Sequence, residues 1–98
     1  MIEIVPLLSA ELDIQSAYDC YEDCREGLGT VFMHRLDESF GQLRIVPESG
    51  PIVHGGYRRL LVPGFPFGIF YTVESRGVIV SGVMDTRQDP EAIIRRLK

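Results

Sequence analysis

The chain has 98 residues and a mass of 11.0 kDa, which is the size of a single domain. Hydrophobic residues make up 45% and charged residues 24%, a composition that excludes a disordered chain and indicates a globular one. The net charge of −4 excludes nucleic-acid binding through bulk positive charge, although it permits a local basic patch.

The start of the chain predicts a strand followed by an amphipathic helix. Residues 2–5 form a short β-branched run that stops at Pro6. Ser9 precedes a helical pattern and is a suitable N-cap. The apolar positions of this pattern recur at steps of four and three and share one helix face: Ala10, Ile14, Ala17, Tyr21, Cys24 and Leu28. The helix is predicted to end at Gly27-Leu28-Gly29.

A second helical pattern follows immediately and predicts a helical hairpin. Its apolar residues are Phe32, Leu36, Phe40 and Leu43. The turn between the two patterns is so short that the helices should lie antiparallel. Residues 47–56 are rich in proline and glycine and are predicted to be a loop.

From residue 57 the pattern becomes typical of strands. Three strands are predicted at 57–62, 67–73 and 78–84, with short connections that favour an antiparallel meander. Asp89-Pro90 then begins a last short helix. The order β-αα-βββ-α indicates an α+β fold in which the hairpin packs on one face of a small antiparallel sheet.

Cysteine and histidine offer no specific chemical signature. Cys20 and Cys24 lie one helical turn apart, and core packing is favoured over a metal site because no further ligand is near in sequence. His34 and His54 are interpreted as surface or hydrogen-bonding residues. We expect no metal and no cofactor. Without an apolar leader or a membrane-spanning run, the simplest expectation is a cytoplasmic protein with no membrane contact.

The charge is divided unevenly along the chain. Residues 1–49 carry ten acidic and three basic side chains, a net charge of −7, whereas residues 50–98 carry four acidic and seven basic ones, a net charge of +3. Nine of the ten basic residues are arginine, which suits bidentate contacts with phosphate or carboxylate. Any polyanion site is therefore expected in the second half.

Within that half, four residues are the candidates for a site. Arg58 and Arg59 are consecutive on a strand, so their side chains should point to opposite faces of the sheet. One of them could converge with Asp85 and Arg87 on the face that the hairpin leaves open. The alternative is an Arg–Asp pair that only closes the end of the sheet.

Several segments resemble a known family. They are Gly56-Tyr57-Arg58-Arg59-Leu60-Leu61, Phe65-Pro66-Phe67-Gly68-Ile69-Phe70-Tyr71-Thr72-Val73-Glu74 and Val83-Met84-Asp85-Thr86-Arg87-Gln88-Asp89-Pro90. In this order they resemble the ParE/RelE superfamily of toxins from bacterial type II toxin–antitoxin systems, which includes plasmid stabilisation proteins. The resemblance spans nearly the whole chain, 1–98, and implies a single ParE/RelE-like toxin domain.

The resemblance implies a toxin that is neutralised by a cognate antitoxin encoded by an adjacent gene. RelE-like members cut messenger RNA on the ribosome, and ParE-like members inhibit DNA gyrase. By position, Arg58 matches the family's strand arginine and Arg87 one of its closing-strand arginines. Tyr57 and Arg59 join them as candidate binding residues, and Arg58, Asp85 and Arg87 are the candidates for a catalytic role.

Departures from the family pattern disfavour an enzyme. The family's histidine is replaced by Asp85 and its second arginine by Gln88, and no tyrosine or histidine follows Tyr71. RNA cleavage by the 2′-hydroxyl needs a base, and an adjacent arginine would lower the pKa of Asp85. A ParE-like toxin with DNA gyrase or another protein as its target is therefore favoured over a ribosome-dependent mRNA interferase. The third alternative is a non-toxic interaction module, and the sequence leaves open whether the chain forms a homodimer.

Overall fold

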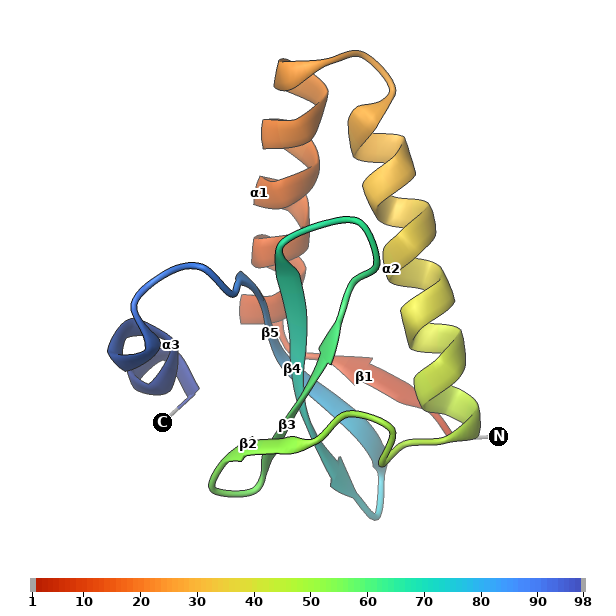
Figure 1. Ribbon diagram of the computed structural model, residues 1–98. Coiled ribbons are helices and arrows are strands. Elements are labelled where there is room, and N and C mark those ends of the chain that lie inside the picture. Colours follow the sequence, from red (N-terminus) through yellow and green to blue (C-terminus); the bar gives the residue numbers. More distant parts are fainter. Residues whose placement is uncertain (1, 98) are drawn as a thin grey trace.

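The computed structural model describes residues 2–97, which form a sheet flanked by helices (Figure 1). The elements in chain order are β1 (Ile4–Pro6), α1 (Leu8–Cys24), α2 (Leu28–Ile45), β2 (Ile52–His54), β3 (Tyr57–Leu61), β4 (Phe67–Glu74), β5 (Gly77–Asp85) and α3 (Pro90–Leu97). The predicted α+β class, the helical hairpin and the three-strand meander are confirmed.

The sheet has five strands in the order β1-β5-β4-β3-β2. Strands β2 to β5 pair antiparallel, and β1 runs parallel to β5. β1 includes Pro6, which the sequence placed after the strand, because an edge strand tolerates proline. The prediction of a loop over 47–56 was wrong at β2. Its three residues lie between Pro51 and Gly55, so they show no strand pattern until they pair with β3.

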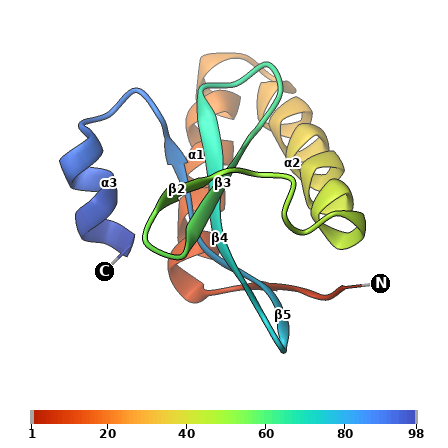
Figure 2. The same ribbon diagram turned by 60° about the horizontal axis from the view of Figure 1, so that its bottom comes forward.

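The helices α1 and α2 pack together on one face of the sheet and bury the main core (Figure 2). The fully buried side chains of this core include residues from both helices and from β4 and β5, among them Ala10, Phe32, Leu36, Leu43, Ile69, Tyr71, Val78, Val80 and Val83. Toward the tip of the hairpin, four rings from the helices and from the start of β4 and the loop before it pack at centroid distances of 4.9–6.0 Å: Tyr21, Phe32, Phe65 and Phe67. Such tilted and edge-on pairs are favourable aromatic geometries.

The helix α1 does not begin with the Ser9 cap that the sequence suggested, and α2 begins without a side-chain cap of its own. α1 begins at Leu8, so Ser9 lies inside the first turn, and its hydroxyl donates to the Ser81 carbonyl at 2.8 Å. α2 follows Gly27, whose φ of 86° needs glycine. The Glu22 carboxylate accepts the N–H of Gly27 at 3.2 Å and that of Gly29 at 2.8 Å, so α1 caps α2.

The stripe of α1 extends beyond the region that the sheet covers. Tyr21 packs against the core, whereas Cys20 and Cys24 are exposed. The prediction that the cysteines pack in the core was therefore wrong. The physical reason is that the tip of the hairpin projects past the sheet, where a helical stripe has nothing to pack against (Figure 1).

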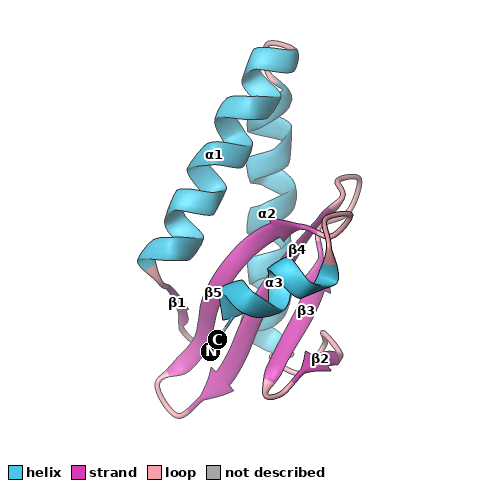
Figure 3. Ribbon diagram, turned by 90° about the vertical axis from the view of Figure 1, so that its left-hand side faces the viewer, coloured by secondary structure: helices cyan, strands magenta, loops and turns pink. Residues whose placement is uncertain are grey.

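The face opposite the hairpin is partly covered by α3 (Figure 3). Ile93 and Leu97 pack against Phe70 and Met84 in a second, smaller apolar cluster. The expectation that this face is open was therefore wrong. The sequence of α3 does not reveal which face of the sheet the helix will cover, because this is decided by the direction of the turn after β5.

A single carboxylate links three elements across the sheet end. Asp13 on α1 accepts two hydrogen bonds from the Arg96 guanidinium on α3, at 3.2 and 2.8 Å. The same side chain accepts the backbone N–H of Val83 on β5 at 3.0 Å. This carboxylate, 18% exposed, therefore fixes α3 to both α1 and the sheet. Within residues 2–97 no helix combines the length and the apolar character needed to cross a membrane.

Candidate functional site

Arg58 and Arg59 point to opposite faces of the sheet, as the strand pattern predicts. Arg58 lies on the hairpin side, where its Nη1 donates to the carbonyls of Gly50 at 2.9 Å and Glu48 at 3.3 Å. These bonds fasten the loop after α2 to β3. Arg58 is therefore engaged in holding the fold and presents fewer free donors to a ligand.

Arg59 and Tyr57 lie on the side that α3 covers. Tyr57 packs against the small apolar cluster of Phe70, Met84 and Leu97. Arg59 lines a groove between α3 and the sheet. Its Nε is buried and has no hydrogen-bond partner within residues 2–97.

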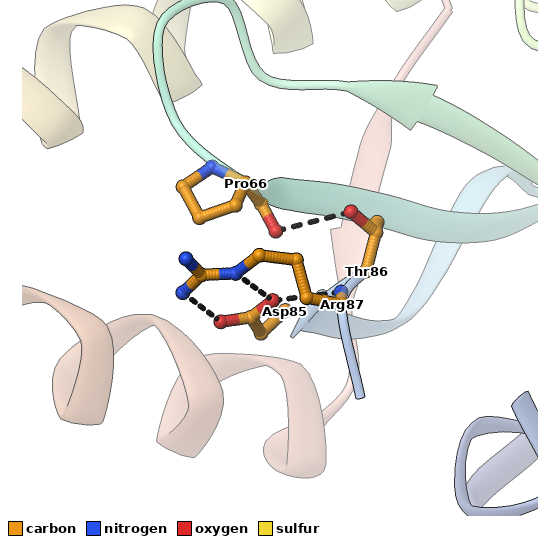
Figure 4. Close-up of polar contacts among 4 residues, drawn as sticks. All are labelled: Pro66, Asp85, Thr86 and Arg87. Carbon is orange, nitrogen blue, oxygen red and sulfur yellow. Dashed lines mark hydrogen bonds and ion pairs between the residues drawn. The ribbon is translucent and has the colours of Figure 1, made fainter. Parts of the chain in front are cut away.

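Asp85 and Arg87 form a closed ion pair at the end of β5 (Figure 4). The guanidinium donates from Nε at 3.1 Å and from Nη2 at 2.8 Å, and the Arg87 backbone N–H also donates to Asp85 at 2.8 Å. Between them, Thr86 donates its backbone N–H to the Pro66 carbonyl at 2.8 Å. The pair therefore belongs to a turn that is fastened to the loop before β4.

These contacts determine the ionisation of the pair. Hydrogen bonds from the Arg87 side chain and backbone hold the pKa of Asp85 below its ordinary value. The same carboxylate raises the pKa of Arg87. Nearby, burial and then the charge of Asp85 raise the pKa of Tyr21. Asp85 is thus a weaker base than an ordinary aspartate, as the sequence predicted, and Tyr21 stays protonated at neutral pH.

The predicted convergence of an Arg58 or Arg59 side chain with Asp85 and Arg87 was wrong. β3 and β5 both run antiparallel to β4, so they run in the same direction as each other. Arg58 is level with Tyr71 and hence with Val80, five residues before Asp85. At about 3.3 Å per residue, the two positions lie about 16 Å apart along the sheet.

The remaining combination, Arg59 with Asp85 and Arg87, is excluded because these side chains lie on opposite faces of the sheet. Asp85 pairs with Phe67, whose ring lies in the aromatic group under the hairpin, whereas Arg59 pairs with Phe70 on the α3 side. The alternative interpretation, an ion pair that closes the sheet end, describes the observed geometry of Asp85 and Arg87. Among residues 2–97 no three histidine, cysteine, aspartate or glutamate side chains are grouped as metal ligands would be.

Sequence reasoning missed two residues that position this region. Tyr71 is fully buried, and its hydroxyl donates to the Pro47 carbonyl at 2.8 Å and accepts the Gly50 N–H at 3.0 Å. Asp13 did not stand out among the ten acidic residues of the first half of the chain. A tyrosine inside an otherwise apolar strand could have suggested a buried hydroxyl, whereas nothing in the sequence pairs Asp13 with Arg96.

Large exposed apolar side chains lie at the end of the hairpin away from its tip and on the edge strand β2. The most exposed are Leu8 at 70%, Leu12 at 60%, Ile45 at 76% and Ile52 at 59%. Leu8 and Leu12 are one turn apart on α1, and Ile52 lies on the edge strand β2. Apolar helix and edge surfaces of this kind are typical docking sites for a partner segment.

Comparison with known proteins places this fold. No protein-family model matches the chain, and no curated protein matches its sequence. A chain in a solved structure titled "Chromosomal ParDE TA system from P. aeruginosa" superposes with a TM-score of 0.76. The match covers 87% of this chain and 96% of that one, at 19% sequence identity. The chain has a ParE/RelE-like fold. The sequence resemblance to that superfamily is thereby supported at the level of structure.

Proposed function

We propose that this chain is the toxin component of a type II toxin–antitoxin module. The observation that carries the proposal is the match over most of both chains to a member of a ParDE toxin–antitoxin structure. On this proposal a cognate antitoxin, encoded by an adjacent gene, neutralises the toxin by folding a segment onto its surface.

Within that function, a protein target is favoured over RNA, as in ParE-like inhibition of DNA gyrase. Three observations support this choice. Asp85 has a lowered pKa and accepts the Arg87 guanidinium, which disfavours it as a general base. Arg58 donates to two backbone carbonyls and lies about 16 Å from Asp85 along the sheet. The net charge of −4 also disfavours the phosphate surface of the ribosome.

Growth is the first test of the toxin proposal. The chain is expressed from an inducible promoter in a sensitive bacterial host, alone and together with the small gene that adjoins it. We expect growth arrest with the chain alone and normal growth with the pair. Normal growth with soluble chain alone would contradict the toxin proposal and favour the non-toxic interaction module.

The target requires a separate experiment. The purified chain is added to a DNA gyrase supercoiling reaction, and transcripts are mapped in cells during growth arrest. Inhibited supercoiling with intact ribosome-bound transcripts is the expected result. Transcripts cut within ribosome-bound codons, with gyrase fully active, would instead identify an mRNA interferase. Arrest with neither effect would identify a different protein target.

A further inference from the structure

A groove between α3 and the sheet has features of a binding site that the proposed function does not use. We call it the α3 groove. It has a volume of about 170 Å³, and its lining includes Val53, Arg59, Phe70, Thr86, Ile93 and Leu97. Its walls are mostly apolar, Arg59 is its only charged lining residue among residues 2–97, and no acidic side chain lines it there.

Arg59 differs from the other arginines near the sheet in having no partner. Arg58, Arg87 and Arg96 each donate to a carbonyl or a carboxylate. The Nε of Arg59 is buried without a hydrogen bond, and no ion pair of its guanidinium occurs within residues 2–97. An unsatisfied donor on a buried charged group is costly, and the terminal nitrogens of the same guanidinium are neither buried nor bonded among these residues, so they are the donors that can take an acceptor in the groove.

The position of Arg59 is built by its neighbours. Its aliphatic stem crosses β4 over Gly68, where an added Cβ would lie 2.9 Å from Arg59 Cγ and 3.1 Å from Thr86 Cγ2. Only glycine leaves room for the stem at this point, so the backbone of β4 and the side chain of Thr86 direct the guanidinium along the groove.

We propose that the α3 groove binds a carboxylate carried by an apolar segment of a protein partner, with Arg59 as its counter-ion. The two Nη groups, which unlike Nε are not fully buried, offer a pair of donors that match the two oxygens of a carboxylate. The apolar walls would bury the side chains beside that carboxylate, and their exclusion of water strengthens the charged hydrogen bonds.

The chemistry of the groove disfavours two other classes of occupant. A nucleic-acid backbone needs several cations along its track, and this groove offers one arginine in a chain of net charge −4. Pockets that hold a drug-sized ligand measure about 300–1,000 Å³, and this groove, at about 170 Å³, is smaller. One acidic side chain with an apolar neighbour fits both the charge and the size.

The identity of the partner as the antitoxin rests on the function proposed above, whereas the carboxylate site itself does not. The two claims therefore fail separately. Growth arrest without peptide binding would overturn only the groove proposal, and peptide binding without growth arrest would overturn only the toxin function.

The test uses two matched synthetic peptides and the full chain labelled with ¹⁵N. The probes are acetyl-Leu-Glu-Leu-Leu-amide and its glutamine counterpart, acetyl-Leu-Gln-Leu-Leu-amide. The Arg59 Nε–H signal and the backbone amides of Thr86 and Ile93 are followed by NMR during titration. We expect these signals to shift with the glutamate peptide, and its affinity to exceed that of the glutamine peptide about tenfold or more.

Two variants distinguish a specific contact with Arg59 from a general effect of positive charge. Arg59→Gln should reduce the affinity for the glutamate peptide about tenfold or more, whereas Arg95→Gln, an exposed arginine on α3, should leave it unchanged. A dispersed NMR spectrum of each variant shows that it is folded. Equal affinity for both peptides, or shifts confined to other surfaces, would overturn the proposal. Displacement of the glutamate peptide by equimolar inorganic phosphate would reassign the groove to phosphate groups and also overturn it.

Discussion

Replacing Tyr71 by phenylalanine would remove one oxygen atom that ties the loop after α2 to the centre of the sheet. The hydroxyl donates to the Pro47 carbonyl at 2.8 Å and accepts the Gly50 N–H at 3.0 Å. Burial raises the pKa of Tyr71, so the hydroxyl stays a donor at neutral pH. Phenylalanine keeps the ring and leaves no cavity, so the change isolates the two hydrogen bonds.

The expected loss of stability follows from the two backbone groups that lose their hydrogen-bond partner. A buried donor or acceptor that loses its only partner costs about 1–3 kcal/mol. The Gly50 N–H is buried and should lie near the upper end, whereas the Pro47 carbonyl is partly buried and regains water more easily. Together we expect about 2–4 kcal/mol. For a domain of this size, that lowers the melting temperature by roughly 10–25 °C.

Thermal and urea unfolding, followed by far-UV circular dichroism, measure this loss. Tyr18→Phe is the matched control, because Tyr18 is half-buried on α1 and makes neither of these bonds. Its effect should stay within about 0.5 kcal/mol, as is usual for a substitution that breaks no buried contact. If Tyr71→Phe is as mild as this control, water replaces the hydroxyl and the loop does not depend on it.

Four further substitutions test the ion pairs and the helix contacts. Arg87→Gln should raise the pKa of Asp85 in a carboxyl-carbon NMR titration, because the guanidinium that lowers it is lost. In the natural chain this pair stabilises the fold above about pH 4, and the contribution disappears as the pH falls through the depressed pKa of Asp85. Asp13→Asn should destabilise the fold by about 1–3 kcal/mol and speed amide hydrogen exchange first in α3, since it weakens bonds to α3 and β5. In urea unfolding, Gly29→Ala should destabilise the fold because its Cβ would lie 2.8 Å from a backbone carbonyl of α1, whereas Gly41→Ala, with open space around it, should stabilise by up to about 1 kcal/mol.

For each of these substitutions, one result would contradict the expectation. An unchanged Asp85 pKa after loss of Arg87 would mean that the backbone N–H alone lowers it. Uniform acceleration of exchange in Asp13→Asn would mean that the carboxylate supports the whole fold rather than α3. Equal effects of the two glycine substitutions would mean that α1 and α2 separate easily at their tip.

The sequence predicted those elements whose residues repeat with a clear period. The steps of four and three along both helices, and the β-branched runs between glycine and proline turns, lie close to the observed bounds of α1, α2, β3, β4 and β5. These patterns reflect burial against a neighbouring layer, so they also indicated which face of each helix meets the sheet. Local periodicity was sufficient because the core under the hairpin is continuous.

Features that depend on strand register and strand direction could not be predicted from local periodicity. The three residues of β2 become a strand only through pairing with β3. The predicted proximity of Arg58 and Asp85 was wrong because β3 and β5, as alternate strands of a meander, run in the same direction. The start of β3 is therefore far from the end of β5. Cys24 obeys the helical period but is exposed as the last residue of α1, whose end at the hairpin tip projects past the sheet (Figure 1).

Arg58, Arg59 and Arg87 were equal candidates for a site in the sequence, but they make different contacts in the structure. These contacts decide how a functional test of each arginine should be interpreted. Arg58 holds the loop after α2, and Arg87 is held by Asp85, so substitution of either changes the fold or its electrostatics before it changes any binding surface. Arg59 alone of the three has a buried donor without a partner among the described residues. A loss of toxicity in an Arg58 variant therefore says little about a site unless its stability is intact. A loss in a folded Arg59 variant would instead identify a contact with another molecule, because no internal bond of its guanidinium is broken.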